Sequence, residues 1–117
     1  MHEISIAEEL ASIVLEAAAS EGLYKVTKVN ITFGQMVQIV PDLFVSAFTE
    51  TVRNTPASNA ALDIEILPLM MMCRICGQRF LVNENRFTCL ICDSTDLDIV
   101  QGKELFIKSI EGEKPDS

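Results

Sequence analysis

Four cysteines in two C-x-x-C pairs, Cys73 with Cys76 and Cys89 with Cys92, constrain this chain more than any other feature. Each pair can form a tight knuckle that directs two thiolates at one ion, and the twelve intervening residues can bring the two knuckles together. Tetrahedral Zn²⁺, with Zn–S bonds of about 2.3 Å, is the usual occupant of a closed four-thiolate site. Iron on the same ligands and paired disulfides are the alternatives. The spacing therefore predicts a small metal-stapled lobe.

The residues around the cysteine pairs support a knuckle at each. Gly77 follows the first pair, where a residue free to adopt a positive φ would close the turn. Asp93 holds the equivalent position after the second pair and tolerates the same conformation less well. Four thiolates around a divalent ion carry a net charge of −2, so we expect Arg74, Arg79 and Arg86 to compensate it.

Length and charge limit the class of protein. With 117 residues, 49% of them hydrophobic, the chain suits one compact unit and leaves no room for a second large domain. It begins without the basic region of a signal peptide and has no apolar run of about 18 residues, so we expect a cytoplasmic protein that does not enter membranes. The formal net charge of −8 repels nucleic-acid backbones and suits cations or a basic protein surface.

Hydrophobic periodicity predicts two helices and two strands before the cysteines. Ser5 and Glu8 have the spacing of a capping box, which predicts a first helix over about residues 5–20. Pro41 suits the first turn of a second helix. The apolar stripe of the first helix is Ile6, Leu10, Ile13, Val14 and Ala17, and that of the second is Phe44, Ala47, Phe48 and Val52. Alternating apolar residues predict two strands with one buried face each, at Val29–Ile31–Phe33 and at Leu62–Ile64–Ile66.

A strand returning after the cysteines indicates that the metal lobe is an insertion. We expect an α+β fold in which two helices pack on a small mixed three-stranded sheet, with a four-cysteine, zinc-ribbon-like lobe inserted between two strands. In this division residues 1–69 form an α/β domain completed by a C-terminal strand at 98–112. Residues 70–97 form the zinc-binding lobe, and residues 113–117 form a frayed tail.

Catalytic motifs are missing from the sequence. The single histidine is His2, so no Ser-His-Asp or Cys-His arrangement is convincing, and cysteines bound to zinc are not free nucleophiles. No G-x-x-x-x-G-K-[ST] loop is available for nucleotide phosphates, so any GTP hydrolysis must come from a partner. We expect a protein that is not an enzyme.

The N-terminus offers a second metal site. The α-amine of Met1, the main-chain nitrogen of His2 and its imidazole Nδ1 can chelate one ion, with the Glu3 amide nitrogen or an outside ligand in the fourth position. Ni²⁺ and Cu²⁺ prefer such a planar nitrogen field. The alternative is a solvated histidine without a role, which is the commoner fate of a lone histidine near a terminus.

Met1-His2-Glu3, the amphipathic helix, the two cysteine pairs and the closing Gly102-x-Glu104-Leu105 segment together resemble the HypA/HybF family of hydrogenase nickel-incorporation chaperones. The resemblance implies that His2 is the nickel ligand, with main-chain nitrogens of Met1 and Glu3 as co-ligands and Glu3 supporting the site. It makes Cys73, Cys76, Cys89 and Cys92 the ligands of a structural Zn(II) ion.

The family resemblance also implies the partners. Ni(II) would be held transiently and delivered to the [NiFe]-hydrogenase large subunit precursor together with a nickel-binding GTPase, and in some bacteria to urease. The chain departs from the family pattern at Leu90, Asp93 and residues 58–60, which bears on partner surfaces more than on metal binding. The competing interpretation is a zinc-ribbon adaptor or nucleic-acid-binding module without a nickel function, but the sequence lacks the basic, aromatic face that this would need.

Overall fold

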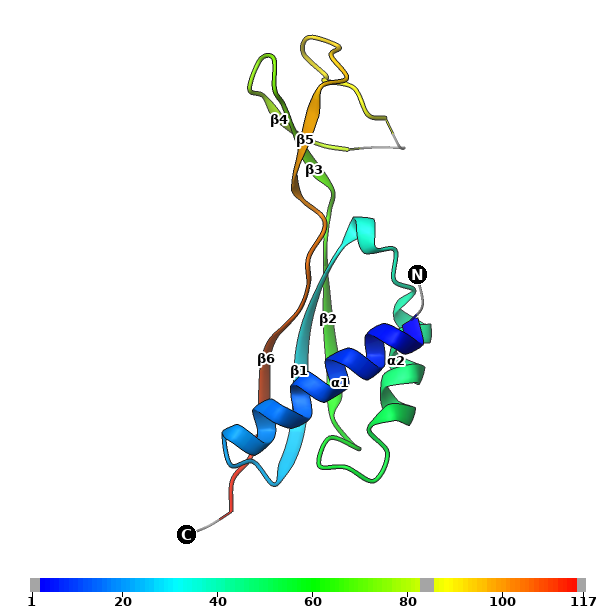
Figure 1. Ribbon diagram of the computed structural model, residues 1–117, viewed down its shortest axis with the longest axis vertical. Helices are drawn as coiled ribbons and strands as arrows, with labels where there is room; N and C mark the ends of the chain where they lie inside the picture. Colours follow the sequence, from blue (N-terminus) through cyan, green and yellow to red (C-terminus); the bar gives the residue numbers. More distant parts are fainter. Residues whose placement is uncertain (1–2, 83–85, 116–117) are drawn as a thin grey trace.

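The computed structural model describes residues 3–82 and 86–115, and it places two helices and six strands in an elongated molecule of 61 × 28 × 16 Å (Figure 1). The elements are α1 (Glu3–Ser20), β1 (Lys25–Gly34), the short 3₁₀ helix η1 (Gln35–Val37), α2 (Pro41–Thr51), β2 (Ala61–Leu67), β3 (Met70–Cys73), β4 (Arg79–Leu81), β5 (Leu97–Gln101) and β6 (Leu105–Glu113).

Two three-stranded sheets divide the molecule along its length. The first has the order β2-β1-β6, with β1 parallel to β2 and antiparallel to β6. The second has the order β4-β3-β5 and is antiparallel. In Figure 1 the helices cover one face of the first sheet, and the second sheet lies at the far end of the molecule. The expected α+β class, with two helices on a mixed three-stranded sheet and a four-cysteine lobe, is confirmed.

The main core lies between the helices and β1. Alternate residues of β1 face the helices and are almost fully buried, as the period-2 pattern predicts. Phe33 packs edge-to-face on Phe44 of α2, with ring centroids 5.1 Å apart and an interplanar angle of 81°. The largest buried side chains of this core are Ile31, Phe33, Phe44 and Phe48. They fix the two helices on the sheet.

The first helix differs from its prediction in two respects. It includes Glu3, so Ser5 lies inside the first turn, and the expected capping box at Ser5 is wrong. Ile13, which was expected in the buried stripe, is 44% exposed, and the buried positions of the helix include the small residues Ala7, Ala11 and Ala18. Pro41 does occupy the start of α2 as predicted.

The chain after the cysteines forms two strands. β5 pairs with β3, whereas β6 pairs with β1 and extends to Glu113. Residues 97–101, which the sequence analysis placed largely in the strand completing the first domain, therefore belong to the sheet of the metal-binding lobe. The interruption falls at Gly102, whose φ of +125° is open to glycine but strained for other residues.

A hydrogen-bonded junction connects the two sheets. The Gln35 side-chain oxygen accepts the Leu69 N–H at 2.8 Å, and the carbonyl of Gly102 accepts the Met36 N–H at 2.9 Å. Gly34 and Gly102 lie so close that a Cβ added to Gly34 would come within 2.0 Å of the Gly102 carbonyl. The 3₁₀ helix η1 thus holds both segments that pass between the sheets.

Candidate metal centre

The four cysteine thiols converge at the end of the second sheet. Their sulfur atoms all lie within 4.8 Å of one another, with Cys73 Sγ 3.5 Å from Cys92 Sγ and Cys76 Sγ 3.6 Å from Cys89 Sγ. All four cysteines are free thiols rather than disulfides. A tetrahedral ion with metal–sulfur bonds of about 2.3 Å requires sulfur–sulfur edges of about 3.8 Å. The donor set and its spacing therefore fit one tetrahedral thiolate-bound metal ion.

The two knuckles have the same backbone geometry. In the first, the Gly77 N–H donates to the Cys73 carbonyl at 2.8 Å. In the second, the Asp93 N–H donates to the Cys89 carbonyl at 3.0 Å. Each closing residue has a positive φ, +76° for Gly77 and +62° for Asp93, as the sequence predicted. The same backbone turn thus occurs on both sides of the cluster, although in the second one Asp93 adopts a left-handed conformation that glycine adopts more easily.

Backbone N–H groups in the knuckles stabilise two of the thiolates. The N–H groups of Cys92 and Ile91 lower the pKa of Cys89 to about 6. The N–H of Cys76 similarly holds the pKa of Cys73 below its usual value. Cys73 and Cys89 are the buried members of the two pairs. Turn geometry therefore prepares one thiolate in each pair for a cation.

The second cysteine of each pair is harder to ionise without a metal. Although the Ser94 N–H favours the Cys92 thiolate, the neighbouring Cys73 thiol and desolvation raise the pKa of Cys92 to about 12. The Gln78 N–H acts on Cys76 in the same way, yet desolvation and the adjacent thiols raise the pKa of Cys76. A divalent ion would reverse this effect, because a coordinating thiol is deprotonated outright.

Arg74 contributes to the lobe by pairing with carboxylates. Its guanidinium is 3.3 Å from Asp96 and also contacts Asp98 at the start of β5. The Arg74 N–H donates to the Asp96 carbonyl at 2.9 Å. Its guanidinium holds the pKa of Asp98 below its usual range, despite the opposing effect of desolvation. Arg74 therefore joins the first knuckle to the strand after the second, a role that the expectation of charge compensation by arginines did not include.

The predicted N-terminal site lies only partly within the described residues. Met1 and His2 fall outside them. Glu3 is the first residue of α1, and its Oε2 accepts the Val40 N–H at 3.2 Å. Val40 is the N-cap residue of α2. The carboxylate therefore ties the beginning of α1 to the beginning of α2, where negative charge is favourable. No sequence pattern pointed to Val40, because this contact depends on how the helices pack.

Comparison with known proteins identifies the family. A family model described as hydrogenase/urease nickel incorporation, metallochaperone, HypA matches residues 1–112. The chain belongs to the HypA family. Within the described residues, no helix has the length and apolar character needed to span a membrane.

Individual HypA proteins are similar over nearly their whole length. The hydrogenase maturation factor HypA of Desulfatibacillum aliphaticivorans is 35% identical over 117 residues, covering 99% of this chain and 90% of that relative. The HypA of Campylobacter jejuni is 35% identical over 108 residues, covering 92% of this chain and 95% of the relative. The solution structure of the Ni metallochaperone HypA from Helicobacter pylori has a TM-score of 0.71 at 28% identity and covers 98% of this chain and 100% of that one.

Proposed function

We propose that this HypA-family protein binds Ni(II) at its N-terminal Met1-His2-Glu3 segment and delivers it for maturation of [NiFe]-hydrogenase, and in addition of urease where that enzyme is present. The observation that carries the proposal is the family match over residues 1–112, which includes both the N-terminal segment and the cysteine lobe. In this role the protein is a carrier rather than an enzyme, and it works in the cytoplasm.

The proposed nickel ligands are the Met1 amine, the main-chain nitrogen and Nδ1 of His2, and the Glu3 amide nitrogen. Planar nitrogen donors suit Ni²⁺, and a site built from a terminus rather than from an enclosed cavity suits transfer by ligand exchange. The contact between the Glu3 carboxylate and Val40 supports this arrangement, because it attaches Glu3, the last residue of the proposed site, to the packed helices.

The four cysteines would hold a Zn(II) ion with a structural role. Closed four-thiolate sites of this kind contribute folding free energy, since the ligands are brought together only when the lobe folds. Cys73, Cys76, Cys89 and Cys92 are the proposed ligands, and their spacing of 4.8 Å or less is the supporting observation. We further propose that the loaded protein docks on a nickel-binding GTPase and on the [NiFe]-hydrogenase large subunit precursor.

Calorimetric titration with Ni²⁺ tests the nickel site. The wild-type chain with an unextended N-terminus should bind one nickel ion, and His2→Ala should abolish this binding while the zinc content is unchanged. Binding should also weaken steeply as the pH falls below about 7.7 to 8.0, the pKa range of the α-amine, because the donors must lose protons.

A matched variant isolates the contribution of the amine. Two residues added before Met1 keep the imidazole but displace the α-amine, so nickel binding should be lost although His2 is retained. Nickel binding that survives both changes would refute the proposed chelate, and the adaptor interpretation would then be preferred.

A further inference from the structure

The outer side of β6 is a free sheet edge. β6 pairs with β1 along Leu105–Glu113, and among the described strands none pairs with its other side. Successive residues of a paired strand direct their backbone N–H and C=O groups alternately toward the neighbour and away from it. The outward groups form a row to which another strand can hydrogen-bond.

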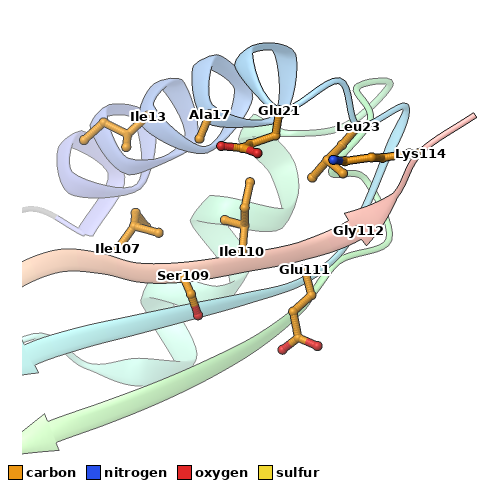
Figure 2. A pocket seen from close by; sticks show the side chains of 10 residues that line it. All are labelled: Ile13, Ala17, Glu21, Leu23, Ile107, Ser109, Ile110, Glu111, Gly112 and Lys114. Carbon is orange, nitrogen blue, oxygen red and sulfur yellow. The ribbon is translucent and has the colours of Figure 1, made fainter.

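An apolar groove runs beside this edge, between α1 and β6. We call it the α1–β6 groove, and it has a volume of about 650 Å³. Figure 2 shows Ile13 and Ala17 on the helix above Ile107 and Ile110 on the strand, with Leu23 at one end. The groove and the free edge lie along the same strand, so a segment paired with β6 could place its side chains in the groove.

A register shift in β6 directs two isoleucines into the groove. Asn30 pairs with Ser109, whereas the next residue of β1, Ile31, pairs with Ile107, so Lys108 is the extra residue of a β-bulge. Ile107 and Ile110 are three residues apart in sequence, yet both line the groove on the helix side of the sheet. The bulge thus concentrates apolar surface under α1.

The charge of the chain indicates which kind of segment could bind in the α1–β6 groove. Glu21 lies at the groove on α1 and Lys114 at one end of it, whereas the Glu111 side chain lies beside the same edge on the face of the sheet away from α1 (Figure 2), and the whole chain carries a net charge of −8. Two copies of the chain would repel each other, whereas a basic segment would be attracted. These features favour a partner protein over self-association through β6.

We propose that β6 and the α1–β6 groove bind an extended segment of a partner protein, which adds to the first sheet as a fourth strand. Main-chain hydrogen bonds to the outer edge of β6 would supply affinity, and alternate apolar side chains would enter the groove to supply specificity. The segment would therefore have apolar residues at every second position and Lys or Arg where it passes Glu21 and Glu111. This surface is separate from the four-cysteine lobe, which lies at the far end of the molecule (Figure 1).

Selection from phage-displayed random dodecapeptides against the zinc-loaded protein tests the proposal. Selected peptides should have alternating apolar residues and a basic flank. On binding they should slow amide hydrogen exchange along β6 by at least about tenfold, since edge N–H groups become hydrogen-bonded. Peptides without alternation, or peptides whose binding protects other elements and leaves β6 unchanged, would overturn it.

A pair of helix variants locates the binding surface. Ala17→Gln fills the groove without changing charge or helix propensity greatly, and we expect at least about tenfold weaker peptide binding. Ala19→Gln, at an exposed position of the same helix, should change binding by less than about twofold. Equal losses in both variants would contradict the proposal. The proposal would also be contradicted if the protein sedimented as a dimer in the absence of peptide and dimerisation protected the β6 amides from hydrogen exchange.

Discussion

Replacing Gly77 by alanine should weaken zinc binding through backbone strain alone. Gly77 has a φ of +76°, and an added Cβ would have no heavy atom within 4 Å, so the substitution introduces no steric clash with neighbouring residues. An L-residue in this left-handed region costs about 1–2 kcal/mol. If the lobe folds around a zinc ion as proposed, strain in the folded knuckle raises the zinc dissociation constant, by about 5- to 30-fold for this free energy.

Competition against a chelator of known zinc affinity measures the effect, and Gly22→Ala is the matched control. Gly22 has nearly the same φ, +72°, and also has no heavy atom within 4 Å of an added Cβ, but it follows α1 far along the chain from the cysteines. This variant should lower the free energy of unfolding of the helical part by a similar amount and leave the zinc dissociation constant unchanged.

A substitution in the second knuckle should have the opposite effect on zinc affinity. Asp93 already tolerates a φ of +62°, so Asp93→Gly should relieve strain of about 0.5–1 kcal/mol and tighten zinc binding about two- to fivefold. If Gly77→Ala had no effect on zinc affinity, or if Asp93→Gly weakened it, the zinc-bound knuckles would not have the positive φ values of Gly77 and Asp93.

Three further predictions concern the junction, the core and the thiols. Gly34→Ala should destabilise the fold by at least about 1–3 kcal/mol in denaturant titrations, because its Cβ would overlap the Gly102 backbone at 2.0 Å; normal stability would show that the two segments are not in contact. Phe44→Ala, at a fully buried position, should cost about 3–5 kcal/mol in the same assay, and a loss below about 1 kcal/mol would mean that the core is not packed as described. Zinc binding at pH 7 should release close to four protons, because without the metal the cysteines lie in an unfolded lobe, where a thiol has a pKa of about 8.5; calorimetry in buffers of different ionisation enthalpy counts them, and release of only two to three would show that the metal-free lobe keeps the knuckle that lowers the pKa of Cys89.

The sequence predicted the elements whose pattern is local. Alternation in β1, the proline at the start of α2 and the spacing of the cysteines each depend on residues a few positions apart, and all three appear in the structure. The positive φ values of Gly77 and Asp93 could be predicted for the same reason, since the backbone must reverse sharply directly after a C-x-x-C pair.

Features that depend on packing between distant segments could not be read from the sequence. The Gln35 side chain accepts a hydrogen bond from the backbone N–H of Leu69, 34 positions away, and β5 pairs with β3 rather than with β1. The bulge at Lys108 also breaks the alternation that sequence reasoning assumes for a regular strand. At the N-terminus, the Glu3 carboxylate accepts a hydrogen bond from Val40, the N-cap residue of α2, and a capping motif within α1 cannot reveal this contact.

The narrow junction between the two sheets makes the metal lobe energetically separable from the helical part. The chain leaves the first sheet at Leu67 and returns to it at Leu105, so beyond the junction the helical part constrains the lobe as a loop closed at both ends. The entropy of closing such a loop grows slowly, by about 0.6 kcal/mol for each doubling of its length. Loss of the metal would therefore convert the lobe into a tethered loop at little cost to the pairing of β1 with β6. With the proposed zinc ion, the lobe would fold or unfold as zinc is gained or lost, while the helical part of the molecule stays folded.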